Sequence, residues 1–224
     1  MKPKVWSYLL SHEVCALSLL RSKQFLVELA LIVGVFSLCT GEFAIMGLLS
    51  TLSTAFNKPE TSAAHLISAY ALGVVIGAPI MVFVGVYLKK RKLIMFLLSI
   101  YTAANLLSLL APNYETLLIS RLIAGFPHAA YFGVAAMIAA SMAPFNKRGK
   151  AVSRILLGVT AAILLGAPGA TYLGQLLGWR SVFACITIFG LGSLYLLYRH
   201  APEIENEHRL DIRAELKSFK SAQV

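Results

Sequence analysis

Four ionisable side chains lie within long apolar stretches of this sequence, where a charge is unfavourable. They are Glu28, Glu42, Arg121 and His128. A charged side chain in the middle of a bilayer costs about 2.5–3.5 kcal/mol on the insertion scale, so such residues are candidates for moving protons or binding ligands. Glu28 lies at the start of its apolar stretch, and we expect it to reach the lipid headgroups.

Glu42 and Arg121 are predicted to form an ion pair. Each lies roughly 7–10 Å inside the same edge of its apolar stretch, at about 1.5 Å of helix per residue. Pairing would offset the cost of burial and hold Glu42 ionised until a substrate or a helix movement separated the two charges. The pair would then act as a proton switch. The alternative is a static structural pair.

Three further side chains are candidates for lining a substrate cavity. His128 lies near the middle of its apolar stretch, Asn105 lies at a similar depth in another, and Tyr131 follows His128 by about one helical turn. A histidine and an amide can bind a polar substrate, and a tyrosine can stack on one. The alternative is that these residues are buried and hydrogen-bonded for packing alone.

The sequence contains no motif for catalysis or for a bound cofactor. The zinc-protease, nucleophile-elbow and phosphate-loop patterns are all missing. The three cysteines, Cys15, Cys39 and Cys185, have no paired spacing, so neither a disulfide framework nor a zinc site is indicated. We therefore expect a protein that is not an enzyme and that binds no cofactor or metal.

The composition indicates a membrane protein. Of the 224 residues, 58% are hydrophobic and 13% are charged, and the mean hydropathy is +0.75. A soluble domain carries about 25% charged residues, so a soluble enzyme and a free nucleic-acid-binding domain are excluded. A crossing needs about 20 apolar residues. Six apolar runs of suitable length predict an all-α protein with six transmembrane helices, near residues 25–49, 63–88, 93–111, 116–142, 151–175 and 181–198.

The basic residues predict the orientation of the chain and its division into segments. Lys and Arg total 20, and 17 of them lie in the two ends and in the second and fourth connections. Because positive charge is retained in the cytoplasm, both termini are predicted to be cytoplasmic. We expect a cytoplasmic N-terminal segment, a six-helix bundle and a cytoplasmic tail, at residues 1–24, 25–198 and 199–224. The net charge of +10 is therefore explained by the membrane topology, and no nucleic acid is expected as a partner.

A four-residue motif occurs twice in the chain. Ile76-Gly77-Ala78-Pro79 in the second span returns as Leu165-Gly166-Ala167-Pro168 in the fifth. Corresponding Gly/Pro interruptions in two three-helix halves are typical of transporters with inverted repeats. The motif predicts close helix packing, since small residues let helices approach. Bending at Pro79 and Pro168 is the more specific hypothesis, and it is compatible with close packing.

Taken in order, the motifs resemble the N-terminal six-helix half of a major facilitator superfamily transporter, over about residues 27–202. The nearest likeness is the bacterial drug:proton antiporter branch that includes arabinose-efflux-permease-like proteins. The motifs that carry this resemblance are Gly41 to Leu49, Ser68 to Pro79, Arg121 to His128, and Gly166 to Gly169 followed by Gly178-Trp179-Arg180.

The resemblance implies a 3+3 inverted repeat, half of a twelve-helix fold, in the bacterial inner membrane. It implies proton-coupled efflux of a small organic substrate such as a sugar or a drug. It also assigns proton coupling to Glu42 and Arg121, and the bend of an antiporter motif to Gly77, Pro79, Gly166, Pro168 and Gly169. The family's loop between the second and third spans corresponds here to Gly85, Lys89 and Arg91, but the acidic residue and the later glycine of that loop are missing.

The family needs two six-helix halves, and this chain is predicted to supply one. Its expected partners are the bilayer, protons, a small-molecule substrate, and either a C-terminal half or a second copy. One alternative is a truncated fragment that transports nothing. Another is a six-helix membrane enzyme or assembly factor, which would need clustered reactive groups or metal ligands at the aqueous boundary.

Overall fold

The computed structural model describes residues 4–203, with side chains described from residue 23 onward. Over this range the chain is helical, with the elements α1 (Lys4–Gly47), α2 (Leu49–Phe56), α3 (Glu60–Tyr87), α4 (Lys90–Leu109), α5 (Tyr114–Gly125), α6 (His128–Met142), the 3₁₀ helix η1 (Phe145–Lys147), α7 (Arg148–Ala161), the π-helix η2 (Ala162–Gly166), α8 (Ala167–Leu177) and α9 (Trp179–His200). Residues 204–224 of the predicted tail lie outside the described residues.

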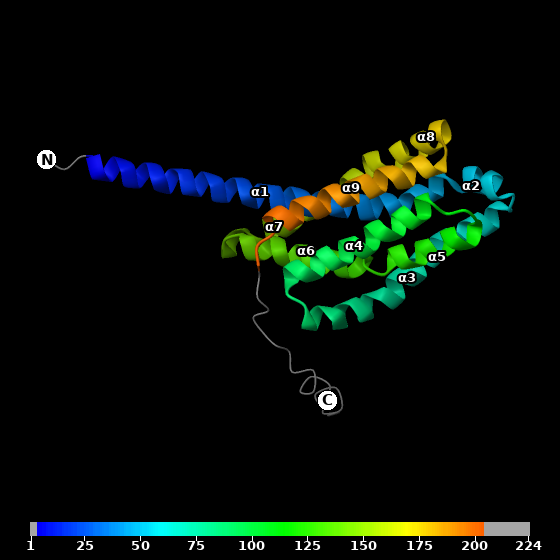
Figure 1. Cartoon of the computed structure of the whole chain (residues 1–224), viewed down its shortest axis with the longest axis horizontal. Helices are drawn as coiled ribbons and strands as arrows, with labels where there is room; N and C mark the ends of the chain where they lie inside the picture. The colour runs from blue at the N-terminus through cyan, green and yellow to red at the C-terminus, as the bar shows by residue number, and fades with distance from the viewer. Residues whose placement is uncertain (1–3, 204–224) are drawn as a thin grey trace, which may run out of the picture.

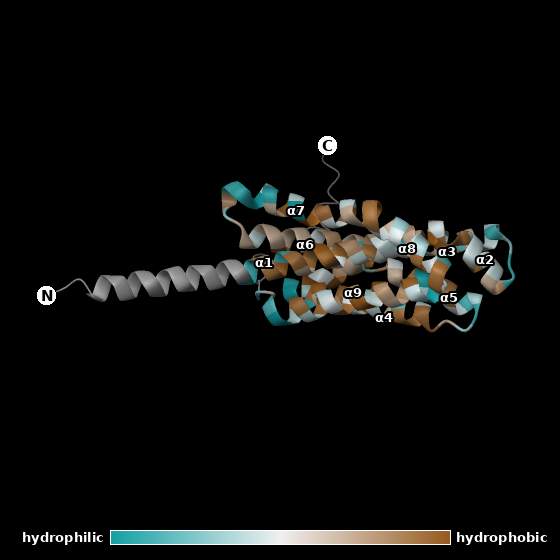
Figure 2. Ribbon diagram, turned by 90° about the horizontal axis from the view of Figure 1, so that it is seen from above, coloured by the Kyte–Doolittle hydropathy of each residue, from teal (hydrophilic) through white to brown (hydrophobic). Residues whose placement is uncertain are grey.

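Six helical segments are long and apolar enough to cross a membrane, which confirms the predicted number. They run over Lys23–Gly47, Glu60–Tyr87, Lys90–Leu109, Tyr114–Met142, Phe145–Leu177 and Trp179–His200. Figure 2 shows apolar residues along the bundle and hydrophilic residues toward its ends. Helix α1 begins at Lys4 and continues directly into the first span.

Residues that favour turns separate the spans. Asn57 ends α2 in the left-handed conformation, with φ of 50°. Asn113 caps α5, since its side chain accepts a hydrogen bond of 2.9 Å from the Thr116 N–H. Gly178 joins α8 to α9 with φ of 83°, a conformation that L side chains rarely adopt. Short connections of this kind make consecutive spans run in opposite directions.

In the six-span bundle, the first helix of each three-helix half packs against the second and third helices of the other half. The first span (α1) packs against the fifth (α7, η2 and α8) and against the sixth (α9). The fourth span (α5 and α6) packs in the same way against the second (α3) and the third (α4). This reciprocal pattern is the one expected of a 3+3 repeat. Figure 1 shows that the first span enters the bundle and the sixth leaves it at the same end.

Two spans contain internal breaks close to proline. The fourth span is interrupted at Phe126–Pro127, between α5 and α6. In the fifth span, the π-helix η2 precedes Pro168, and the Ala167 N–H donates to the Ala162 carbonyl five residues back. A proline lacks the N–H that an α-helix needs, so irregular turns of this kind take up the mismatch.

Candidate functional site

A polar cluster lies between the first, second and fourth spans. The Nε2 atom of His128, at the start of α6, lies 3.5 Å from Oε2 of Glu42 in α1. Its Nδ1 atom lies 2.7 Å from the hydroxyl of Tyr70 in α3. The His128 side chain is 13% exposed and that of Glu42 is 36% exposed. Imidazole therefore connects a carboxylate to a buried phenol, an arrangement that can hold a proton at the histidine or at the acid.

Arg121 of α5 completes the cluster from its buried side. The residue is fully buried, and its Nη2 donates a hydrogen bond of 2.8 Å to the carbonyl of Gly41, next to Glu42. The guanidinium carbon lies 4.4 Å from the centroid of the Tyr70 ring, close enough for a cation–π contact. Among the described residues, its Nε and Nη1 atoms have no hydrogen-bond partner.

The pairing within this cluster differs from the one predicted. We expected Glu42 and Arg121 to bind each other directly. Instead, Glu42 faces His128, and Arg121 reaches the backbone one residue before Glu42. The break at Phe126–Pro127 begins a new helix at His128, which places the imidazole opposite α1. Depth along a span was predictable, but the direction of each side chain was not.

Cys39 adds a third donor atom to Glu42 and His128. Its sulfur, a carboxylate oxygen of Glu42 and a ring nitrogen of His128 all lie within 4.8 Å of one another. These are the atom types that zinc accepts, so among the described residues this is a place that could hold a metal ion. Cys39 is 3% exposed, whereas the Glu42 side chain is 36% exposed. The scattered spacing of the cysteines did not predict it.

The three predicted cavity residues lie in different surroundings. His128 belongs to the cluster above. Asn105 is fully buried in α4, and its Nδ2 donates to the Tyr101 carbonyl one turn earlier, at 2.8 Å. Tyr131 is also fully buried, with its hydroxyl against Gly34 and near Ser193. No hydrogen bond joins any two of these three side chains in the described part of the chain.

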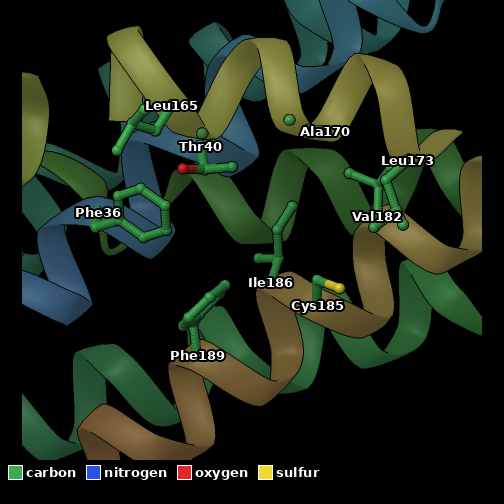
Figure 3. Close-up of a pocket in the computed structure, with 11 residues that line it drawn as sticks. Phe36, Thr40, Leu165, Ala170, Leu173, Val182, Cys185, Ile186 and Phe189 are labelled. Atoms are coloured by element: carbon green, nitrogen blue, oxygen red, sulfur yellow. The ribbon is translucent and has the colours of Figure 1, made fainter. Parts of the chain in front are cut away.

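An apolar cavity of about 170 Å³ lies on another side of the first span. Figure 3 shows its lining side chains, which come from α1, from η2 and α8, and from α9. Gly166 and Gly169 of the repeated motif line it, whereas Asn105, His128 and Tyr131 do not. Thr40 brings a hydroxyl to its edge, and this hydroxyl has no hydrogen-bond partner among the described residues.

The motif glycines lie where helices approach closely. Gly77 meets the backbone of Phe126 in the fourth span, and Gly166 meets the side chain of Thr40 in the first. Pro79 lies inside the continuous helix α3, whereas Pro168 lies in the first turn of α8, after the π-helix. Gly169 has open space where a Cβ would be.

The connection between the second and third spans contacts the end of the sixth. Nη2 of Arg91 donates to the carbonyl of Tyr198 at 2.7 Å. Lys89 Nζ lies 3.9 Å from a carboxylate oxygen of Glu203. Gly85 lies near Leu93, whose side chain would touch an added Cβ. Glu203, the acidic residue that Lys89 contacts, follows α9.

Glu28 does not reach out to the headgroups as expected. It is 6% exposed, and its carboxylate pairs with Arg154 Nη1 of α7 at 3.0 Å. The Gln24 side-chain amide donates to its other oxygen at 3.1 Å. A buried carboxylate needs such partners.

The polar contacts of Tyr70 were not predicted from the sequence. Its position in an apolar span indicated packing, but its ring lies under Arg121 and its hydroxyl lies against His128. No local pattern in the sequence distinguishes this tyrosine from the other aromatic residues of the spans.

Comparison with known proteins gives a consistent result. Residues 31–223 match the Major Facilitator Superfamily. The chain is 37% identical over 196 residues to the inner membrane transport protein YdhP of Escherichia coli K12. The matched region covers 88% of this chain and 50% of YdhP. It is 36% identical over 195 residues to the putative transporter AraJ of the same organism, again covering 87% of this chain and 50% of the relative. The chain thus spans about half the length of the curated relatives it matches.

Solved structures share the fold. A D-xylose–proton symporter superposes with a TM-score of 0.70 at 21% identity, over 88% of this chain and 52% of the symporter. A bacterial homologue of the human lysosomal transporter Spinster gives 0.66 at 20% identity, over 88% of this chain and 48% of that one. At these identities the likeness shows the arrangement of helices and not a shared substrate.

Proposed function

The chain belongs to the Major Facilitator Superfamily, and on this premise we propose that it forms the N-terminal half of a proton-coupled transporter that exports a small organic molecule, such as a sugar or a drug. The observation that carries the proposal is the cluster of Glu42, His128, Tyr70 and Arg121 inside six apolar spans. Ionisable groups at such positions are typical of proton pathways.

In the proposed mechanism, Glu42 is the group that takes up and releases the proton. While ionised, its carboxylate is attracted to His128, when the imidazole is protonated, and to the nearby charge of Arg121. A proton bound to the carboxylate removes this attraction, so that the first span can move relative to the fourth. Arg121 can follow such a movement, since two of its donors are not committed to a partner among the described residues.

The Gly/Pro motif of the fifth span supports the proposed direction of transport. The π-helix before Pro168 is a local irregularity in a span that packs against α1. Irregular turns of this kind often lie at functional sites. We propose that movement at Glu42 is passed to this span, and that Gly166 to Gly169 shape the bend associated with antiport.

A complete pathway in this proposal needs a second six-helix body. The relatives are about twice as long as the part that matches, so a C-terminal half or a second copy of this chain is the proposed partner. We further propose that both termini face the bacterial cytoplasm, in keeping with the distribution of Lys and Arg.

Proteoliposomes test the proposal. The chain is reconstituted alone and together with a separately expressed C-terminal half of a relative, under an imposed proton gradient, with radiolabelled arabinose and ethidium as probes. We expect gradient-driven movement of a probe in the paired sample. Glu42→Gln should abolish its dependence on the gradient, whereas Glu60→Gln, at an exposed position in the first turn of α3, should leave it unchanged. Movement that is equally proton-dependent in both variants would remove Glu42 from the mechanism.

A second measurement separates proton binding from transport. Infrared difference spectra of the purified chain between acidic and alkaline pH should contain a protonated-carboxyl band that Glu42→Gln removes and Glu60→Gln retains. If this band were present while no probe moved, Glu42 would bind a proton in a protein that does not export these probes.

A further inference from the structure

Two basic segments lie at the end of the bundle where the first span enters. One is the connection between α3 and α4, with Lys89, Lys90, Arg91 and Lys92. The other is the connection between α6 and α7, where Lys147, Arg148 and Lys150 follow Phe145. Figure 2 shows hydrophilic residues at this end on both α4 and α7. Their charge alone is explained by topology, so what distinguishes the two segments is how their cations are used.

The first basic segment is held by the protein itself. Arg91 donates to the Tyr198 carbonyl, and Lys89 lies beside the Glu203 carboxylate. These contacts attach the α3–α4 connection to the end of α9. Two of its four cations therefore have partners within the chain.

The second basic segment has a different arrangement. Lys147, Arg148 and Lys150 are exposed, and in the described part of the chain no salt bridge joins them to an acidic residue. The neighbouring acid, Glu28, is already occupied by Arg154. Three positive charges thus face outward from the beginning of the fifth span, and an anion would have to come from outside the described chain.

An exposed aromatic residue precedes these cations. Phe145 is 85% exposed and the guanidinium carbon of Arg148 lies 5.3 Å from the centroid of its ring. Amphipathic segments that combine a bulky apolar side chain with Lys and Arg lie in the membrane interface, where the apolar group enters the acyl boundary and the cations face the headgroups. Phe145 lies at the first residue of a span segment, at the depth where such an interface is expected.

We propose that the segment Phe145–Lys150 is a binding site for the headgroup of an anionic phospholipid. Phe145 enters the acyl boundary, while Lys147, Arg148 and Lys150 surround the lipid phosphate. Clusters of Lys and Arg immediately beside a membrane span bind anionic lipids, and each basic side chain contributes about fivefold in affinity. The α3–α4 connection is the weaker competitor, because part of its charge is used within the protein.

The experiment uses the whole purified chain, exchanged into a neutral detergent. Native mass spectrometry measures the occupancy of added phosphatidylglycerol, with phosphatidylcholine of the same acyl chains as the neutral comparison. Lys147→Gln/Lys150→Gln is the test variant, and Lys90→Gln/Lys92→Gln is the matched control with the same residue types and the same change in charge. Thermal unfolding of both variants checks that the fold is retained.

We expect phosphatidylglycerol to bind more tightly than phosphatidylcholine. The test variant should weaken this binding by roughly 25-fold, at about fivefold for each lysine, and the control variant should weaken it much less. Phe145→Ala should weaken both lipids by a similar factor, because its contact is with the acyl region. Equal losses in the two double variants, or no preference between the lipids, would overturn the proposal.

Inorganic phosphate separates a lipid from a free anion. If phosphate at the same concentration displaced phosphatidylglycerol completely, and did so only with Lys147 and Lys150 present, the segment would be a site for a free anion and the lipid assignment would be wrong. We expect phosphate to displace little of the lipid, since it lacks an acyl chain to contact Phe145.

Discussion

The two copies of the Gly-Ala-Pro motif occupy equivalent spans but produce different structures. In the second span the copy ending at Pro79 lies within the continuous helix α3, and Gly77 lies against the Phe126 backbone. In the fifth span the copy ending at Pro168 follows a π-helix, and Gly166 lies against the Thr40 side chain. Each glycine meets the first helix of the other half of the bundle, as the repeat requires.

The difference between the copies lies in what each glycine touches. A backbone cannot move without shifting its whole helix, whereas a side chain can change rotamer. The second span therefore packs against backbone atoms of the fourth, whereas the fifth span packs against a threonine side chain of the first. The second-span copy is thus suited to packing, and the fifth-span copy is the better candidate for bending.

The largest effect is expected from Gly77→Ala. The new Cβ would collide with backbone atoms of Phe126, so two helices must separate, and we expect destabilisation of about 1–3 kcal/mol or more. Thermal unfolding of the purified protein in detergent measures it. Gly133→Ala is the matched control, because no atom lies within 4 Å of an added Cβ there. Equal melting temperatures in the two variants would contradict the packing role of Gly77.

Gly166→Ala should have a smaller effect that depends on Thr40. The collision is with the Thr40 side chain, which can rotate away, so we expect a loss near the lower end of the overpacking range, about 1 kcal/mol. Thr40→Ala should relieve part of this loss, and a double-mutant cycle of unfolding measures the coupling. Additive effects of the two substitutions would show that they do not meet.

Pro168→Ala is expected to change the shape of the fifth span more than its stability. Restoring the missing N–H allows an ordinary helical hydrogen bond, which favours a regular helix over the π-helix before it. Spin labels placed at exposed positions on either side of the motif, such as Leu156 and Leu176, would report the distance along the span. We expect the distance to shift in Pro168→Ala, and an unchanged distance would show that Pro168 does not maintain the irregular turn.

The smallest effect is expected from Gly169→Ala. Nothing lies within 4 Å of an added Cβ at this position, so the change in unfolding free energy should stay within about 0.5 kcal/mol. The same unfolding assay applies. A loss as large as that of Gly166→Ala would mean that the open space beside Gly169 is closed in solution.

Much of the fold could be predicted from the sequence. The 3+3 repeat was implied by the family resemblance and indicated by the duplicated motif, whereas the number of spans and their approximate bounds followed from apolar run length and turn residues. These are local properties, because a run of about 20 apolar residues must form a helix across a bilayer whatever its neighbours are. The break at Phe126–Pro127 was not expected.

The candidate site was predicted less completely. Glu42, Arg121 and His128 were singled out because charged and polar groups are unfavourable in an apolar span, and the structure brings all three to one cluster. Their pairing was not predictable, since Glu42 faces His128 and Arg121 reaches Gly41. No sequence signal placed Tyr70 and Cys39 in the cluster. Glu28 pairs with Arg154 instead of reaching the headgroups.

The sequence by itself therefore determined the class, the number of membrane helices and the residues that an apolar environment should not tolerate, because each follows from the cost of moving a local group out of water. Only the tertiary structure decided which partners those residues have. Partner choice depends on the rotation and bending of helices far apart in the chain, and these are set by packing among all six spans.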